Sequence, residues 1–296
     1  GWVQDEEVLQ MANSALEVML ADFLNNSLDG FAFGAKSRVY STIWLEGGTI
    51  ALYTLLGNDL GTHQENFPSG MATITMLLCD WQPSDTLLSI ASDRSKEYES
   101  RERHQAFQLP DDPGITESMK KYNYVTEDYG MGAINQFERV TGLVNLRKPS
   151  MLYEGINTWV PQGHQELPWS LYIGKTKDCI IFDSHPSKNS ADVSGQHNYW
   201  TGDVACMDYR YFQNENVILG MHNVTVTTEA QFTHFYIPRN SFDEVVEEDG
   251  WVFLRKGDVY VGIKMLKNGT VTSEPQYTWT TNGTWANKEA IIDSPK

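Results

Sequence analysis

The sequence predicts a chain of the α+β class, in which an N-terminal helical segment is followed by a large antiparallel β-sandwich. Two observations indicate this order. Apolar residues recur at spacings of three and four in the first 120 residues, whereas short runs rich in Val, Tyr, Thr and Gly follow from about residue 123. Strand after strand without intervening helices is typical of an antiparallel sandwich. We therefore expect a helical segment over residues 1–122 and a β-sandwich domain over residues 123–296.

The expected helices follow from apolar periodicity and from capping residues. In EEVLQMANSALEVMLADFLNN (6–26), the apolar side chains form one stripe of a helix. Pro83-Ser84-Asp85 ends one helix and starts the next, because Ser is a favourable N-cap residue. Further helices are expected at RVYSTIWLEGGTIALYTLLGN (38–58), GMATITMLLCDW (70–81), TLLSIASDR (86–94) and the charged run SKEYESRERHQAF (95–107).

The second half is expected to consist of short strands joined by turns. In DGWVFLRKGDVYVGI, two β-rich runs flank Lys256-Gly257-Asp258, which predicts a hairpin. In ACMDYRYFQ (205–213), alternation places Tyr209 and Tyr211 on one face, and Asp208 and Arg210 on the other. Further strands are expected within 123–137, 170–174, 179–184, 216–228, 233–238 and 270–279.

The composition limits the classes of partner. The chain carries 22 basic and 39 acidic residues, a net charge of −17, which repels nucleic acid and anionic membranes. No apolar run approaches the roughly 20 residues that span a membrane. The three cysteines include no CxxC pair, so at most one disulfide can form, and Cys179 with Cys206 is the candidate pair. We expect neither nucleic acid nor a membrane as partner.

Familiar signatures of cofactor and metal chemistry are missing from the sequence. There is no GxSxG elbow, Walker A loop, Rossmann fingerprint, HExxH motif or EF-hand. Asp183, His185 and Asp192 resemble a metal-binding set only loosely, since one His and two carboxylates of uncertain direction are a poor signal. We expect no cofactor and no metal.

The sequence also bears on where the protein is found. Four Asn-Xaa-Ser/Thr sequons occur, at Asn25, Asn223, Asn268 and Asn282, and they predict a glycoprotein in a eukaryotic secretory route. The chain starts with GWVQDEEVLQ, without Met or a signal peptide. We expect a secreted or periplasmic protein, and a chain that is part of a longer polypeptide whose N-terminal portion is a partner.

Several segments resemble the closing part of heparinase II/III-like and related proteins. They are GAKSRVYSTIWL (34–45), YNYVTEDYGMGAINQ (122–136), NYWTGDVACMDYRYFQNENVILGMHN (198–223) and EEDGWVFLRKGDVYVGIKML (247–266). The resemblance implies an incomplete α/α toroid followed by a β-sandwich, and the activity of a polysaccharide lyase on a uronate-containing glycan. The sequence lacks the H-x-H-x-D stretch that accompanies a metal site in some members.

A lyase of this kind has three tasks. It neutralises a uronic carboxylate, removes the adjacent carbon-bound proton and protonates the leaving oxygen. Arg38 can bind a carboxylate in bidentate fashion, and Tyr40 lies two residues away as an acid or base. His197 precedes a strand, in a loop where chemistry is possible. We therefore expect Arg38, Tyr40 and His197 to be catalytic.

Substrate-binding residues are expected in loops rich in Gly, Pro and aromatic residues. In WVPQGHQELPW (159–169), two indoles flank His164, and exposed tryptophans stack on sugar rings. The structural alternative is that both indoles pack inward. The expected substrate-binding residues are Asn198, His63, Trp159, His164 and Tyr129.

Two other functions fit the same residues. A glycoside hydrolase on the same scaffold needs two carboxylates at a suitable separation, for which Glu154, Glu166 and Asp203 are candidates. A non-catalytic carbohydrate-binding or structural module needs no acid or base at all. In each case the expected partner is a polysaccharide or oligosaccharide.

Overall fold

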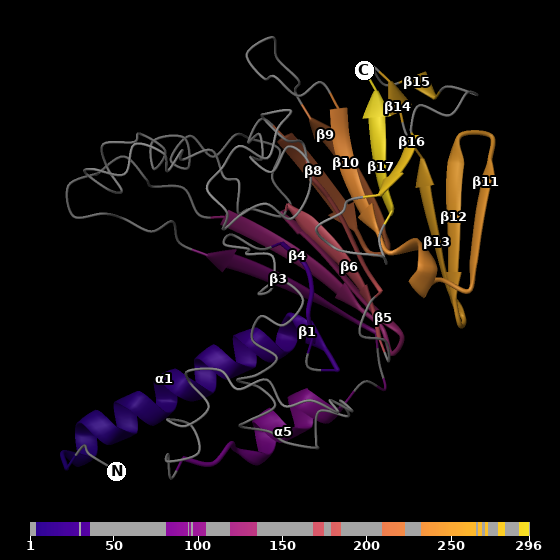
Figure 1. Ribbon diagram of the computed structural model, residues 1–296. Helices are drawn as coiled ribbons and strands as arrows, with labels where there is room; N and C mark the ends of the chain where they lie inside the picture. The colour runs from indigo at the N-terminus through magenta and orange to yellow at the C-terminus, as the bar shows by residue number, and fades with distance from the viewer. Residues whose placement is uncertain are drawn as a thin grey trace, which may run out of the picture.

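The computed structural model shows a chain that is mixed but mostly β (Figure 1). It contains two α-helices and many antiparallel strands in several sheets within the described residues, so the expectation of helices followed by antiparallel strands is confirmed. Among these residues no helix is long and apolar enough to cross a membrane. The described residues are 4–29, 31–35, 81–93, 95, 97–104, 119–134, 168–174, 179–184, 209–222, 232–264, 266–267, 270–271, 278–281 and 290–295.

The two helices form where capping residues and apolar stripes predict them. Helix α1 (Glu6–Asn25) begins at Asp5, whose carboxylate accepts from the backbone N–H groups of Glu7 and Val8. Helix α5 (Asp85–Ser92) is capped by Ser84. The Glu17 carboxylate joins the helices, because it accepts from the backbone N (3.1 Å) and the hydroxyl (2.7 Å) of Ser84. The helix expected at 38–58 lies outside the described residues, as does the helix expected at 70–81 except for Trp81, which is not helical.

An eight-stranded antiparallel sheet forms the centre of the molecule. Its order is β16 (Thr278–Thr281), β17 (Ala290–Pro295), β10 (Phe232–Ile237), β7 (Ile180–Ser184), β6 (Trp169–Ile173), β5 (Tyr129–Ile134), β4 (Met119–Val125) and β3 (Tyr98–His104). Smaller sheets are β1 (Ser27–Leu28) with β2 (Phe31–Ala32), β8 (Tyr209–Asn214) with β9 (Val217–His222), β11 (Glu244–Glu248) with β12 (Trp251–Lys256) and β13 (Val259–Lys264), and β14 (Leu266–Lys267) with β15 (Thr270–Val271). A short 3₁₀ helix, η2 (Arg239–Ser241), precedes β11.

The helix expected at 95–107 is wrong, because this segment contains strand β3 instead. Its seven residues pair with β4 from Tyr98 opposite Val125 to His104 opposite Met119. Tyr98, Ser100 and Glu102 are half-buried, whereas the residues between them are exposed, which is the two-residue period of a strand. Long-range pairing with β4 therefore outweighs the helical propensity of a run rich in Glu, Lys and Arg. Residue 122 itself lies within β4, so hydrogen bonds cross the expected domain boundary, and the division into two domains stays a prediction.

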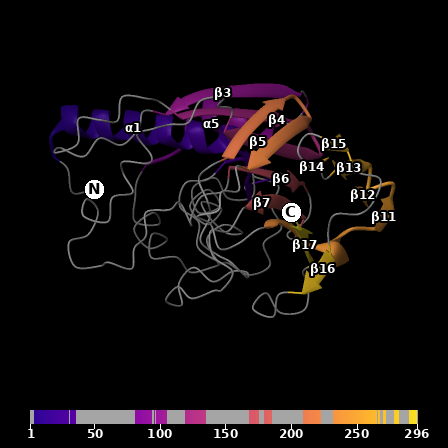
Figure 2. The same ribbon diagram turned by 90° about the horizontal axis from the view of Figure 1, so that it is seen from above.

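The core lies on both faces of the central sheet. On one face, Met131, Trp169 and Leu171 pack against residues of the β8–β9 hairpin and the β11–β13 sheet. On the other face, Leu28 and Phe33 pack on Val125 and Tyr172. Seen from above, the β11–β13 sheet lies at the opposite side of the molecule from α1 (Figure 2). Because Val252 and Leu254 belong to the core while Trp251 and Phe253 are exposed, the β11–β13 sheet has one face in the core and one toward solvent.

Candidate functional site

The candidate functional site is the solvent side of the β11–β13 sheet. Strand residues alternate between the two faces of a sheet, and here the inward set joins the core: Val252, Leu254, Val259 and Ile263. The outward set includes three large aromatic side chains. Trp251, Phe253 and Tyr260 are 37%, 42% and 75% exposed. We call these three residues the outer aromatic face.

The strand register brings the aromatic rings together. Phe253 lies opposite Gly262 across β12 and β13, and Trp251 is its neighbour on the same face of β12. The Trp251 and Phe253 rings have centroids 5.5 Å apart and planes that differ by 12°. A Cβ on Gly262 would lie 3.4 Å from the Trp251 ring and 3.5 Å from the Phe253 ring. The two rings therefore meet above Gly262, where the missing side chain leaves room for them.

Two tight turns hold the three strands in this register. The β12–β13 hairpin predicted at Lys256-Gly257-Asp258 is confirmed, and Gly257 has a φ of +56°. Between β11 and β12, Asp249 (φ 50°) and Gly250 (φ 73°) both adopt the left-handed conformation. Consecutive residues with positive φ are the mark of a type I′ turn, whose twist matches that of paired strands. The outer aromatic face is therefore supported by two short hairpins.

Paired charges lie on and beside the strands that carry the aromatic rings. Arg255 donates to Glu244 (3.2 Å), and this hydrogen bond raises the pKa of Arg255. Asp243 accepts from the backbone N–H of Gly257 (2.8 Å) and from Lys256 (3.2 Å), and these two hydrogen bonds lower the pKa of Asp243. By the strand register, Arg255 and Glu244 share the face of the aromatic rings, so they can meet sugar hydroxyls beside rings that meet the C–H groups of a sugar. Lys256 has the same orientation as Val252 and Leu254 and lies on the opposite face.

Tyr129 is the one predicted site residue that lies within the described part of the chain. It is half-buried on β5, with its ring centroid 6.2 Å from that of Tyr124. Burial raises the pKa of Tyr129, the Glu97 carboxylate adds to this, and a hydrogen bond with Asn216 opposes it. Its phenol is therefore uncharged at neutral pH and can exchange hydrogen bonds with a sugar hydroxyl. Tyr129 lies on the central sheet and does not belong to the outer aromatic face.

The other predicted site residues lie outside the described part of the chain, and their roles stay predictions. They are the catalytic candidates Arg38, Tyr40 and His197 and the substrate-binding candidates His63, Trp159, His164 and Asn198.

Trp169 does not stack on a ligand, and for this indole the structural alternative is confirmed. Its side chain is only 7% exposed, and its Nε1–H donates to the carboxylate of Asp183. The hydroxyl of Tyr211 donates to the same oxygen, at 2.6 Å. Asp183, which the sequence placed loosely in a metal-binding set, is itself buried and engaged with these two donors. Within the described ranges, no three His, Cys, Asp or Glu side chains gather as metal ligands.

Cys179 is buried at the start of β7, where its thiol donates to the carbonyl oxygen of Ser241 at 3.4 Å. Cys206 lies outside the described residues, so the candidate disulfide stays a prediction.

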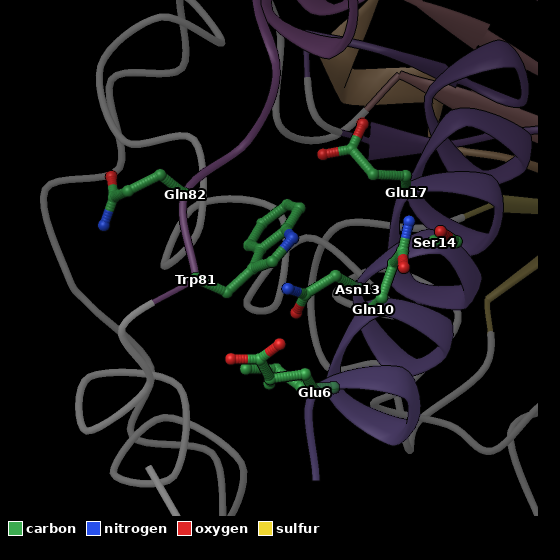
Figure 3. A pocket seen from close by; sticks show the side chains of 8 residues that line it. Glu6, Gln10, Asn13, Ser14, Glu17, Trp81 and Gln82 are labelled. Carbon is green, nitrogen blue, oxygen red and sulfur yellow. The ribbon is translucent and has the colours of Figure 1, made fainter. Parts of the chain in front are cut away.

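A second feature, a groove, lies between α1 and the segment before α5 (Figure 3). The groove has a volume of about 480 Å³, and the Trp81 indole faces the helix across it. Its walls carry the amides of Gln10 and Asn13 and the carboxylates of Glu6 and Glu17. This groove is open and acidic, and Glu17 is already engaged with Ser84. The outer aromatic face is therefore the stronger candidate for binding.

The sequence also indicates the outer aromatic face, although this face lies on strands and not in the loops where substrate-binding residues are expected. In WVFLRKGDVY (251–260), alternation places Trp251 and Phe253 on one face of a strand, and the hairpin turn brings the next strand beside them.

Comparisons of the chain with protein-family models, with curated proteins and with solved structures found no match. The functional interpretation therefore depends on the site and on the sequence.

Proposed function

We propose that this protein is carbohydrate-active and holds a polysaccharide or oligosaccharide against the outer aromatic face. The observation that carries this proposal is the exposure of Trp251, Phe253 and Tyr260 together on one side of one sheet. Neighbouring exposed aromatic residues with a polar border are typical of a binding surface. The C–H groups of a sugar ring pack on such rings, while its hydroxyls reach the charged groups beside them.

The arrangement of layers supports a finer proposal for the fold. One face of the central sheet is covered by the β8–β9 hairpin and the β11–β13 sheet, as expected of a β-sandwich. The α1 and α5 pair packs through Leu20, Leu24 and Leu87, which fits the end of an incomplete α/α toroid. Of the secreted or periplasmic location proposed from the sequence, the sequons support the secreted one, because they belong to a eukaryotic secretory route.

For the reaction, we propose β-elimination on a uronate-containing polysaccharide. The support is the resemblance of four segments to heparinase II/III-like proteins, with Arg38 at the carboxylate and Tyr40 and His197 in proton transfer. The uncharged phenol of Tyr129 is suited to a hydrogen bond with a sugar hydroxyl. A glycoside hydrolase on the same scaffold is the second proposal for the reaction.

A binding module without catalysis is the remaining proposal, and the outer aromatic face itself favours it. Contact between sugar rings and aromatic rings requires no acid or base, so this site works equally well in a module that only retains a glycan.

Replacing Trp251 by alanine is expected to weaken glycan binding about thirty-fold, because a central aromatic contact contributes about 2 kcal/mol to binding. The dissociation constant is measured by titration calorimetry, first with a panel of soluble acidic and neutral polysaccharides and then with the best ligand. Phe212→Ala is the matched control, since Phe212 is an aromatic residue of similar exposure, 39%, on β8. Equal affinity of Trp251→Ala and the unaltered protein contradicts the proposal.

A further inference from the structure

We infer that Lys264 makes the outer aromatic face selective for sugars that carry a negative charge, either a carboxylate or a sulfate ester. This inference rests on the proposed function, because it assigns a ligand class to the same face. It concerns a residue that takes no part in the predicted chemistry of Arg38, Tyr40 and His197.

The Lys264 ammonium group is held in place beside the aromatic rings. Lys264 lies directly opposite Trp251 in the pairing of β12 and β13, and its Nζ lies 5.4 Å from the centroid of the Trp251 ring. The same Nζ donates to the carbonyl oxygen of Asp249. That carbonyl belongs to the left-handed Asp249-Gly250 turn, which directs it toward β13. A π face and a backbone carbonyl thus fix the position of the cation without neutralising it.

Three other basic side chains, in η2 and β12, are already paired with carboxylates. Arg239 pairs with Glu247 (3.2 Å), Arg255 with Glu244 (3.2 Å) and Lys256 with Asp243 (3.2 Å). Within the described ranges, by contrast, Lys264 makes no ion pair with a carboxylate. Lys264 is therefore the basic group of this face that is available to an anionic ligand.

The strand register places the nearest acidic residue of the row on a different strand from Lys264. Glu248 on β11 and Lys264 on β13 are both partners of Trp251, so they lie on the two strands that flank β12. An ammonium group has three N–H donors, and the Asp249 carbonyl uses one. The remaining donors can bind the acidic substituent of a sugar whose ring contacts Trp251 and Phe253.

Net charge makes a local cation necessary for such a ligand. The protein carries −17 overall, and this field repels a polyanion unless the binding surface supplies positive charge. A charge-assisted hydrogen bond from Lys264 favours a carboxylate or sulfate over a hydroxyl. Added salt screens this attraction between exposed charges, so the preference for acidic glycans is expected to shrink as ionic strength rises.

The test compares three soluble polymers by titration calorimetry: polygalacturonate with carboxylates, carrageenan with sulfate esters, and a neutral galactan. Lys264→Met keeps the apolar stem and removes the charge. We expect it to weaken binding of at least one acidic polymer about ten-fold and to leave galactan binding unchanged. Lys264→Arg restores a cation and is expected to retain affinity within about three-fold. The acidic polymer that responds identifies carboxylate or sulfate as the recognised group.

Lys256→Met is the matched control, since it removes the same charge from a residue that is paired with Asp243. A loss in Lys264→Met no larger than that in Lys256→Met overturns the inference. If Trp251→Ala still weakens binding about thirty-fold in that case, the proposed function survives and only the charge selectivity fails. If none of the three polymers binds the unaltered protein, both proposals fail. Thermal unfolding of each variant confirms that it is folded.

Discussion

Replacing Lys121 by methionine is expected to lower the free energy of unfolding by about 4 kcal/mol. Lys121 Nζ lies 3.0 Å from Glu102 Oε2 and 3.0 Å from Asn26 Oδ1, and the Lys121 and Glu102 side chains are each only 13% exposed. Asn26 also donates to Glu102 Oε1, at 2.6 Å. Without the ammonium group, the Glu102 carboxylate stays largely buried and loses its counter-ion. Urea denaturation followed by circular dichroism measures the loss.

A neighbouring ion pair within strand β3 provides the control. Arg101 pairs with Glu99 at 2.8 Å, but their side chains are 73% and 37% exposed. Because water and salt screen such a pair, Arg101→Met is expected to lower the free energy of unfolding far less than Lys121→Met does. The double variant Lys121→Met/Glu102→Gln is expected to be more stable than Lys121→Met alone, since it removes the buried charge. Equal costs for Lys121→Met and Arg101→Met contradict this explanation.

Cleavage of a uronate polysaccharide is expected to fall at least about one hundred-fold in both His197→Ala and Tyr40→Phe. The proposed β-elimination needs a group that removes the carbon-bound proton and a group that protonates the leaving oxygen, and each variant removes one candidate. The absorbance of the unsaturated product in the ultraviolet measures the rate. Thermal unfolding is measured alongside, so that lost activity is not confused with lost structure.

The same assay separates the proposed reactions. Trp251→Ala is the control variant, because it is expected to raise the glycan concentration required while leaving the maximal rate within a few-fold. Full activity in both His197→Ala and Tyr40→Phe contradicts the catalytic assignment. New reducing ends on neutral glycans without ultraviolet absorbance identify a hydrolase. Glycan binding without any product identifies a binding module.

Much of the fold could be predicted because local patterns and long-range pairing agree. The apolar stripe of α1, the Ser84 cap of α5 and the turn at Gly257 each specify their element locally. β3 could not be predicted, because a run rich in Glu, Lys and Arg favours a helix by local propensity. Only the partner strand β4, about twenty residues further on, makes the extended form more stable.

The candidate site was harder to predict than the fold. Alternation groups Trp251 with Phe253 and Val252 with Leu254, but both groups are apolar, so the pattern alone does not say which faces solvent. The answer depends on the packing of Val252 and Leu254 against the central sheet. For Trp169, the sequence allowed an exposed indole, but the structure buries it. Its hydrogen-bond partner Asp183, fourteen residues further along the chain, stabilises the indole in the core.

Hydroxyl-radical footprinting with and without a bound polysaccharide tests the central claim most directly, because it reads the protection of individual side chains. Phe253 and Phe212 form a matched pair, with exposures of 42% and 39% on different sheets. Binding at the outer aromatic face predicts reduced oxidation of Trp251, Phe253 and Tyr260, with Phe212 unchanged. A polysaccharide that binds without protecting these three residues contradicts the account.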